Sequence, residues 1–281
     1  MGAVEQSKSL LRASVIVVAV VLAYVFVVVA YAIGNSPEGP DTRVANPAGA
    51  LVYLDLNSVD GEDFSIGVRV SVYPGRDLLD GNGYPLTALA VDVSPIADDR
   101  VLLFESGRTI GPVASTIYSD GDIRQWPFDR YRAESVVVRV FADTDAGREP
   151  IPSTVVVTDS LTGWNVDAGP DDHASGEPFD IIMSRNVASK VFALAICVVL
   201  LALPACALFV AVQTLRRRKK FQPPMVTWFA VMLFAVLPIR NLFPGAPPIG
   251  SWVDFSVVLW VVLGLIVAMI LYVGTWWREA P

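Results

Sequence analysis

Long apolar segments near both ends of the chain dominate its hydrophobic pattern. Val15–Ile33 has nineteen residues without a charge, and about 20 helical residues cross the ~30 Å hydrocarbon core of a bilayer. Val191–Gln213 and Trp252–Trp277 are similar, while Met225–Ile239 has only fifteen residues, so that a tilted or re-entrant segment is its alternative. The pattern predicts four transmembrane helices, at residues 14–33, 190–213, 225–240 and 252–275.

The first apolar segment also has features of a secretory signal. Lys8 and Arg12 precede it, and Ala30-Tyr31-Ala32 resembles a small-residue cleavage site. Its length instead favours an uncleaved anchor helix. Both interpretations place residue 35 outside the cytoplasm.

Residues 50–188 have the pattern of a β domain. Valines at positions 68, 70 and 72 alternate with Arg69, Ser71 and Tyr73, as expected for a strand with one face in water. Asp-Gly pairs separate several such segments and suit tight turns. The predicted strands are Leu51–Val59, Phe64–Tyr73, Leu86–Ser94, Val101–Glu105, Val113–Ser119, Glu134–Asp143, Thr154–Asp159 and Pro178–Arg185. We therefore predict an all-β sandwich, or alternatively a barrel, after a Pro/Gly-rich linker at 34–49.

The charge distribution predicts an orientation in the membrane. The loop at 214–224 contains five consecutive cations, Arg216–Lys220, and such clusters stay on the cytoplasmic side. We therefore expect an α+β, multi-pass protein of the plasma (inner) membrane, with the sandwich between the first and second helix. Residues 34–189 would be extracytoplasmic, and the termini, 1–13 and 276–281, would both be cytoplasmic.

Charge also predicts partners. Residues 35–189 contain 25 acidic and 11 basic residues, and this excess of negative charge argues against nucleic acid as a partner. The cations of the basic loop would attract anionic lipid head groups at the cytoplasmic face.

Few residues favour catalysis. The one histidine, His173, lies in a segment with the composition of a flexible loop, where a histidine is usually solvated. Acidic turns such as 60–63 and 120–122 offer oxygen atoms to calcium, but no turn has EF-hand spacing. No cluster of Cys and His suits zinc. We predict no catalytic residue, no metal site and no cofactor.

The densest local motif is Trp-Pro-Phe-Asp-Arg-Tyr at 126–131. Three aromatic rings, a proline of fixed φ and an Asp–Arg pair do not all face water cheaply. One interpretation is a rigid corner at one end of the sandwich, with Asp129 accepting hydrogen bonds from loop amides. The other is a docking loop for the membrane helices or a partner. The candidate residues are Trp126, Pro127, Phe128, Asp129, Arg130 and Tyr131.

A Pro/Gly-rich hairpin at 241–251 connects the last two apolar segments. Topology alone does not require so many backbone-restricting residues between two helices. Arg240 and Asp254 flank the hairpin, and we predict that they pair across it. We also predict that the hairpin meets segment 126–131. The candidate residues are Arg240, Asn241, Pro244, Gly245, Pro247, Pro248, Gly250 and Asp254.

These motifs carry a family resemblance. With Leu237–Asn241, Pro244–Gly250, Asp254 and Trp126–Asp129, the chain resembles a family of actinobacterial, mostly mycobacterial, four-span membrane proteins with a domain of unknown function. The resemblance implies location and architecture, because that family has no established activity. Some four-span mycobacterial envelope proteins are accessory subunits of larger assemblies, lipid importers among them.

The function that the sequence favours is therefore non-catalytic. We expect a scaffold or an accessory or assembly subunit of a larger envelope complex, such as a lipid transporter, with membrane proteins as partners. The alternative is an extracytoplasmic sensor or a lipid- or solute-binding protein. An envelope hydrolase that uses carboxylates is a minor alternative.

Overall fold

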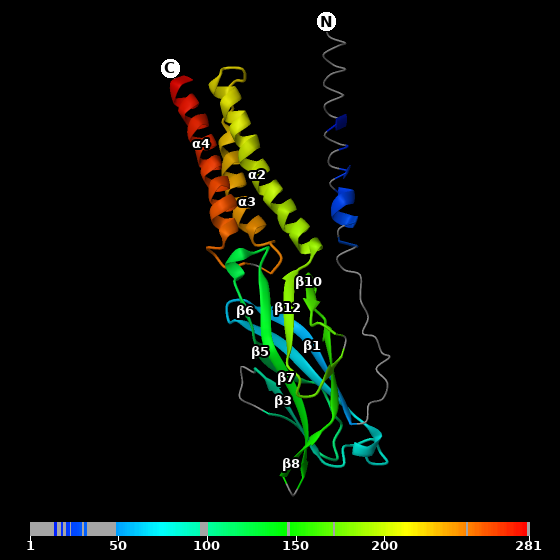
Figure 1. Ribbon diagram of the computed structural model, residues 1–281. Coiled ribbons are helices and arrows are strands. Elements are labelled where there is room, and N and C mark those ends of the chain that lie inside the picture. Colours follow the sequence, from blue (N-terminus) through cyan, green and yellow to red (C-terminus); the bar gives the residue numbers. More distant parts are fainter. Residues whose placement is uncertain are drawn as a thin grey trace. The chain divides into compact units, whose positions relative to one another are not determined.

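The chain forms two units in a computed structural model (Figure 1). A β domain contains residues 49–123 and 128–185, and a helical unit contains residues 124–127 and 186–279 together with the described residues between 14 and 32. The structure describes residues 14, 15, 18, 21, 22, 24–29, 31, 32, 49–95, 101–144, 147–170, 172–245 and 247–279.

The β domain is built from two sheets. One has the strand order β11–β9–β1–β2–β5, and the other has the order β10–β12–β7–β3–β4, with β6 and β8 also paired to β7. The strands are β1 (Ala50–Asp60), β2 (Ser65–Pro74), β3 (Ala88–Ser94), β4 (Leu102–Phe104), β5 (Val113–Tyr118), β6 (Asp120–Gly121), β7 (Arg130–Thr144), β8 (Gly147–Ile151), β9 (Ser153–Asp159), β10 (Trp164–Asp167), β11 (His173–Ala174) and β12 (Phe179–Arg185). Two 3₁₀ turns lie between strands, η1 (Arg76–Leu78) and η2 (Ile123–Gln125).

Alternating apolar residues form the core between the sheets. Val52 and Leu54 of β1 and Val138 and Val140 of β7 belong to one buried cluster that draws on both sheets. Burying apolar surface in this way is the main favourable term in folding. The β-sandwich architecture is therefore set by the period-two pattern of its strands.

Each of the eight predicted strands is present, although β7 begins four residues earlier than predicted. The additional strands β6, β8, β10 and β11 have two to five residues. Such short segments are not long enough to show a clear alternation of apolar and polar residues. They form because a longer neighbour offers them hydrogen-bonding partners.

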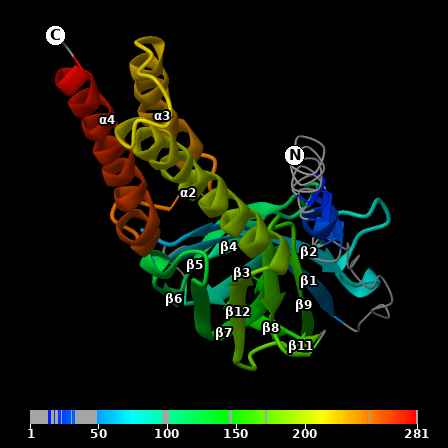
Figure 2. The same cartoon turned by 90° about the horizontal axis from the view of Figure 1, so that it is seen from above.

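Three helices of the helical unit lie side by side (Figures 1 and 2). They are α2 (Val187–Leu215), α3 (Pro224–Arg240) and α4 (Leu259–Glu279), with a π-helical turn, Asp254–Val258, that leads into α4. Asn186 caps the first of them, because its side-chain oxygen accepts a hydrogen bond from the Ser189 amide at 2.9 Å.

Small side chains let α2 and α4 approach closely. The buried stripe of α2 includes Ala193, Pro204, Ala207 and Ala211, at successive spacings of eleven, three and four residues, which keep them on one face of the helix. A Cβ at Gly264 of α4 would lie 2.8 Å from Pro204 Cβ. Glycine therefore permits the close helix contact here, as small residues commonly do between apolar helices.

Replacing Gly264 with alanine is expected to destabilise the helical unit by about 1–3 kcal/mol, because the added methyl group overpacks the contact with Pro204. The matched control is Gly274→Ala, since a Cβ there meets no described atom within 4 Å; it should be neutral or slightly stabilising. Thermal unfolding of the purified full chain measures both. Equal midpoints for the two variants would contradict a tight contact at Gly264.

The predicted fold class, four transmembrane helices with the sandwich between the first and second, is wrong. Among the described residues, two helices are long and apolar enough to cross a membrane, Val187–Leu215 and Asp254–Arg278, and the β domain precedes both. Helix α3 has 17 residues, or about 26 Å at the usual rise, which is less than the ~30 Å of a bilayer core.

The predicted first helix is described only in part. Residues 14, 15, 18, 21, 22, 24–29, 31 and 32 are helical. The other residues of 14–33, the N-terminal segment 1–13 and the predicted linker up to residue 48 lie outside the described residues.

Candidate functional site

A buried ion pair closes one end of the β domain. Strands β7 and β12 are antiparallel with Arg130 opposite Ser184, so this register brings Asp129, just before β7, beside Arg185 at the end of β12. Arg185 Nε lies 3.2 Å from both oxygens of Asp129, and Arg185 Nη2 lies 3.2 Å from Oδ2. The side chains are only 7% and 0% exposed. The register of two strands thus creates a desolvated pair that local sequence does not reveal.

Aromatic rings cover this ion pair. The Arg185 guanidinium lies 3.9 Å from the centre of the Trp164 ring, close enough for a cation–π interaction. Trp164 in turn meets Tyr131 edge to face, with ring centres 5.6 Å apart. Burial, followed by the charge of Asp129, raises the pKa of Tyr131 above its ordinary value. The phenol therefore remains a hydrogen-bond donor in this cluster at neutral pH.

Two glycines make room for Tyr131. A Cβ at Gly61 would overlap the Tyr131 hydroxyl, and a Cβ at Gly121 would overlap the ring. The Asp-Gly pairs predicted as turns thus have a second role in packing.

The acidic turn at 60–63 uses its own carboxylate. Asp60 Oδ1 accepts hydrogen bonds from the amides of Glu62 and Asp63, at 2.9 and 3.1 Å, so this oxygen satisfies two backbone donors of the turn.

The motif at 126–131 is divided between the two units. Phe128 to Tyr131 belong to the β domain, whereas Trp126 and Pro127 belong to the helical unit. Phe128 and Arg130 are exposed, while Asp129 and Tyr131 are buried. A structural corner was predicted with loop amides as the partners of Asp129, but its carboxylate instead receives hydrogen bonds from Arg185, 56 residues away.

Trp126 packs within the helical unit against the Pro/Gly hairpin. Its indole Nε1–H donates a hydrogen bond to the Pro244 carbonyl at 2.9 Å, and its ring centre lies 4.7 Å from that of Phe243. The side chain is fully buried. The predicted meeting of the two motifs is therefore confirmed for Trp126.

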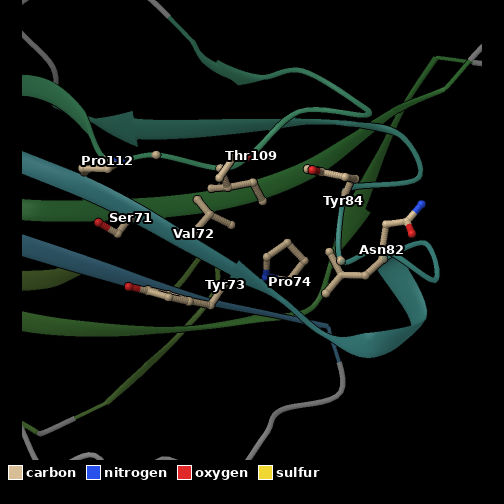
Figure 3. A pocket seen from close by; sticks show the side chains of 12 residues that line it. Ser71, Val72, Tyr73, Pro74, Asn82, Tyr84, Thr109 and Pro112 are labelled. Carbon is tan, nitrogen blue, oxygen red and sulfur yellow. The ribbon is translucent and has the colours of Figure 1, made fainter.

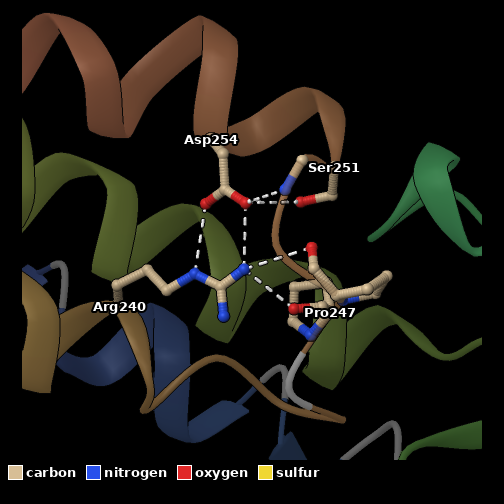
Figure 4. Close-up of polar contacts among 6 residues, drawn as sticks. Arg240, Pro247, Ser251 and Asp254 are labelled. Carbon is tan, nitrogen blue, oxygen red and sulfur yellow. Dashed lines mark hydrogen bonds and ion pairs between the residues drawn. The ribbon is translucent and has the colours of Figure 1, made fainter.

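Arg240 and Asp254 pair across the hairpin, as predicted (Figure 4). Arg240 Nε lies 3.1 Å from Asp254 Oδ1, and Nη2 lies 2.9 Å from Oδ2, which is the bidentate geometry of a strong pair. Arg240 Nη2 also donates to the carbonyls of Pro247 and Pro248, at 2.8 and 3.2 Å. The Gly250 amide donates to Asp254 Oδ2 at 2.8 Å.

These contacts hold the hairpin in one conformation. Gly245 and Gly250 have φ of 74° and 97°, a region that favours glycine. The Asn241 amide donates to the Leu237 carbonyl at 3.1 Å, the last helical hydrogen bond of α3. Large apolar side chains nevertheless point outward from this rigid frame: Leu242, Ile249, Trp252 and Phe255 are exposed, and Ile249 is 94% exposed. We call these four residues the hairpin apolar surface.

The histidine has a different environment from the one predicted. His173 lies in β11, where it pairs with Val155 of β9, and it is buried rather than solvated. Its ring stacks on Phe179 with centres 4.0 Å apart. The strand β11 has only two residues and follows a Gly- and Asp-rich segment. Two residues are too few to show the alternation that predicts a strand, and the sequence therefore predicted a loop.

Comparison with known proteins identifies two domains, both of unknown function. Residues 185–279 match the model described as domain of unknown function (DUF8686). Residues 40–183 match the model described as domain of unknown function (DUF4436). No curated protein matches the sequence significantly. Because the second match covers just over half of the 281 residues, the chain belongs to the DUF4436 family.

Proposed function

We propose that this protein is a non-catalytic accessory or scaffold subunit of a membrane protein complex in the cell envelope. The observation that carries the proposal is the hairpin apolar surface. Leu242 and Ile249 are exposed on the hairpin, Trp252 and Phe255 are exposed on the helical turns that follow it, and the Arg240–Asp254 pair ties the two ends of the hairpin together. A rigid loop loses little conformational entropy when a partner binds, which favours affinity.

The helices support a membrane location. The outward faces of α2 and α4 are apolar along their length, with Phe192, Leu194 and Phe209 exposed on α2 and Trp260 and Ile270 exposed on α4. In water such surfaces would be a strong liability, whereas lipid tails solvate them well. We therefore infer that α2 and α4 cross the plasma membrane.

The charges support an orientation. Arg216–Lys220 follow α2, all five are exposed, and clusters of this kind favour the cytoplasmic side and anionic lipids at about 1 kcal/mol per charge. The Tyr272 hydroxyl donates to the Gln222 carbonyl at 3.0 Å and accepts from the Gln222 amide at 2.9 Å, which fixes the end of this basic loop on α4. In this orientation the β domain, which precedes α2, is extracytoplasmic.

The polar groups of the site favour a structural role over a catalytic one. The carboxylates of Asp129 and Asp254 are each neutralised by a bidentate arginine. An acid or base that already holds two strong charge-assisted hydrogen bonds is poorly placed to exchange protons with a substrate. The same contacts are well suited to rigidity.

A partner-recovery experiment tests the proposal. Tagged full-length protein is purified in mild detergent, and co-purified proteins are quantified for the wild type and for Ile249→Ser. We expect stoichiometric recovery of specific membrane proteins with the wild type. Recovery with the variant should fall by about tenfold or more, because central apolar anchors dominate interface energies.

Leu103→Ser provides the matched control. Leu103 is also an exposed aliphatic side chain of the same size, but it lies on β4 of the β domain. It should leave recovery unchanged, and both variants should keep the wild-type unfolding temperature. Wild-type protein that purifies alone, or equal recovery with Ile249→Ser, would argue against the accessory-subunit role.

A further inference from the structure

A pocket of about 480 Å³ opens on the β domain beside the end of β2. Its walls come from three segments: the end of β2, the turn at 79–84 and the segment 109–112 before β5. Figure 3 shows Tyr84 and Thr109 on one side of it and Tyr73 and Pro74 on the other. This volume is within the range of about 300–1,000 Å³ that is usual for small-molecule sites.

The lining of the pocket is uncharged. None of the twelve residues that the structure describes around it is Asp, Glu, Lys, Arg or His. The surrounding segment of the chain, residues 35–189, contains 25 acidic and 11 basic residues. A charged ligand would gain no ion pair here, while its desolvation would still cost free energy. The lining therefore favours a neutral ligand.

Hydrogen bonds hold the pocket walls in place before any ligand binds. Asp80 Oδ1 accepts from the amides of Asn82 and Tyr84 at 2.9 and 2.8 Å, and the Asp80 amide donates to the Tyr84 carbonyl at 2.7 Å. The Gly107 amide donates to the Pro85 carbonyl at 3.1 Å, which ties the loop before residue 109 to the turn. Preorganised walls lower the entropic cost of binding.

The side chains combine flat rings with neutral hydrogen-bonding groups. Tyr84 offers a ring and the Thr109 hydroxyl donates and accepts hydrogen bonds, whereas the Tyr73 ring packs edge to face against Tyr53, with ring centres 5.5 Å apart. An uncharged sugar ring has the matching chemistry, because its C–H faces are apolar and its edge is a row of hydroxyl groups. A lipid tail would leave these polar groups unpaired, which disfavours it.

We infer that this pocket binds an uncharged hexopyranose unit of a saccharide. The inference is independent of the partner-binding role, because it uses β-domain residues that the hairpin experiment does not change. Free saccharides and the head groups of neutral glycolipids share this chemistry, so both are sources to be distinguished.

Saturation-transfer difference NMR on the full chain in phosphatidylglycerol nanodiscs tests the inference without a sugar-based detergent. The probes are maltose, cellobiose and N,N′-diacetylchitobiose at millimolar concentration. At least one of these disaccharides should receive saturation from the protein. Glucuronic acid should displace it with an apparent affinity at least about tenfold weaker than that of glucose, because the pocket has no cation to pair with a carboxylate. Absence of transfer to all three disaccharides overturns the inference.

Variants locate the binding. Tyr84→Ala should weaken it by about tenfold through loss of ring contact. Gly111→Trp should abolish binding. Gly111 lines the pocket, and a Cβ there meets no described atom within 4 Å, so an indole has room to occupy the space that the ligand needs. Tyr118→Ala is the matched control, an exposed tyrosine on β5 outside the lining. If Tyr84→Ala and Gly111→Trp, each with a wild-type unfolding temperature, both keep wild-type binding, the site lies elsewhere and the inference fails.

Two further arms identify the source of the ligand. If a glycolipid with a neutral disaccharide head group, built into the same nanodisc, suppresses the signal of the free disaccharide, the pocket takes its sugar from the membrane. If the signal is unchanged, the pocket takes a free saccharide; both results support the site. If a proline-rich peptide receives saturation from the protein and none of the sugars does, the saccharide inference is wrong and the pocket binds a peptide.

Discussion

Arg240→Ala is expected to destabilise the helical unit by about 3–5 kcal/mol, the usual cost of leaving one partner of a buried ion pair without the other. The side chains of Arg240 and Asp254 are only 10% and 17% exposed, so water compensates little for the lost contact. The variant also removes the donor to the Pro247 and Pro248 carbonyls. Loss of both contacts frees the hairpin as well as the helix ends.

Hydrogen exchange measured by mass spectrometry reports this change locally, because opening free energies differ between regions of a protein. Protection of peptides from 237–258 should fall strongly in Arg240→Ala, and less in Arg240→Lys, which keeps the charge but not the planar bidentate geometry. Arg69→Ala is the matched control: Arg69 lies 3.6 Å from Asp55, but the side chains are 50% and 23% exposed. It should cost less than about 1 kcal/mol. A similar small loss in Arg240→Ala would show that the hairpin does not depend on the pair.

Asp129→Ala is expected to destabilise the β domain by a similar amount, about 3–5 kcal/mol. Arg185 would remain buried beneath Trp164 with its charge uncompensated. Asp129→Asn should be nearly as harmful, because the neutral amide keeps the shape but not the charge. Hydrogen exchange of β7 and β12 peptides measures the loss, since Asp129 and Arg185 join the ends of these two strands.

The same two strands offer an internal control. The ion pair between Arg132 and Asp180 also joins β7 and β12, but it is half-exposed. Arg132→Ala should therefore destabilise the domain far less than Asp129→Ala does. Equal effects of Asp129→Ala and Arg132→Ala would contradict a special role for the buried pair, and with it the structural interpretation of the motif at 126–131.

Sequence patterns predicted the parts of this protein that depend on local chemistry. The eight strands were predicted because each is long enough for its side chains to alternate between the core and water. The Arg240–Asp254 pair was predicted because the two residues are 14 positions apart and flank one short connection. In both cases the information lies within a few turns of chain.

Hydropathy gave a wrong fold class for the same local reason. It reports how apolar a segment is, and α3 is as apolar as its neighbours, although its 17 residues fall short of a bilayer. Among the described residues two helices meet the length requirement, and the β domain precedes both.

Packing across the chain determined the rest. Asp129 and Arg185 are 56 residues apart and meet because of the register between β7 and β12, which depends on a whole core face rather than on either residue. Trp126 meets the Pro244 carbonyl across 118 positions, and its membership in the helical unit separates it from the rest of its own motif. The uncharged pocket likewise joins three segments of the chain. Local patterns choose strands, helices and turns, whereas the contacts between distant side chains follow from how the buried faces of those elements fit together.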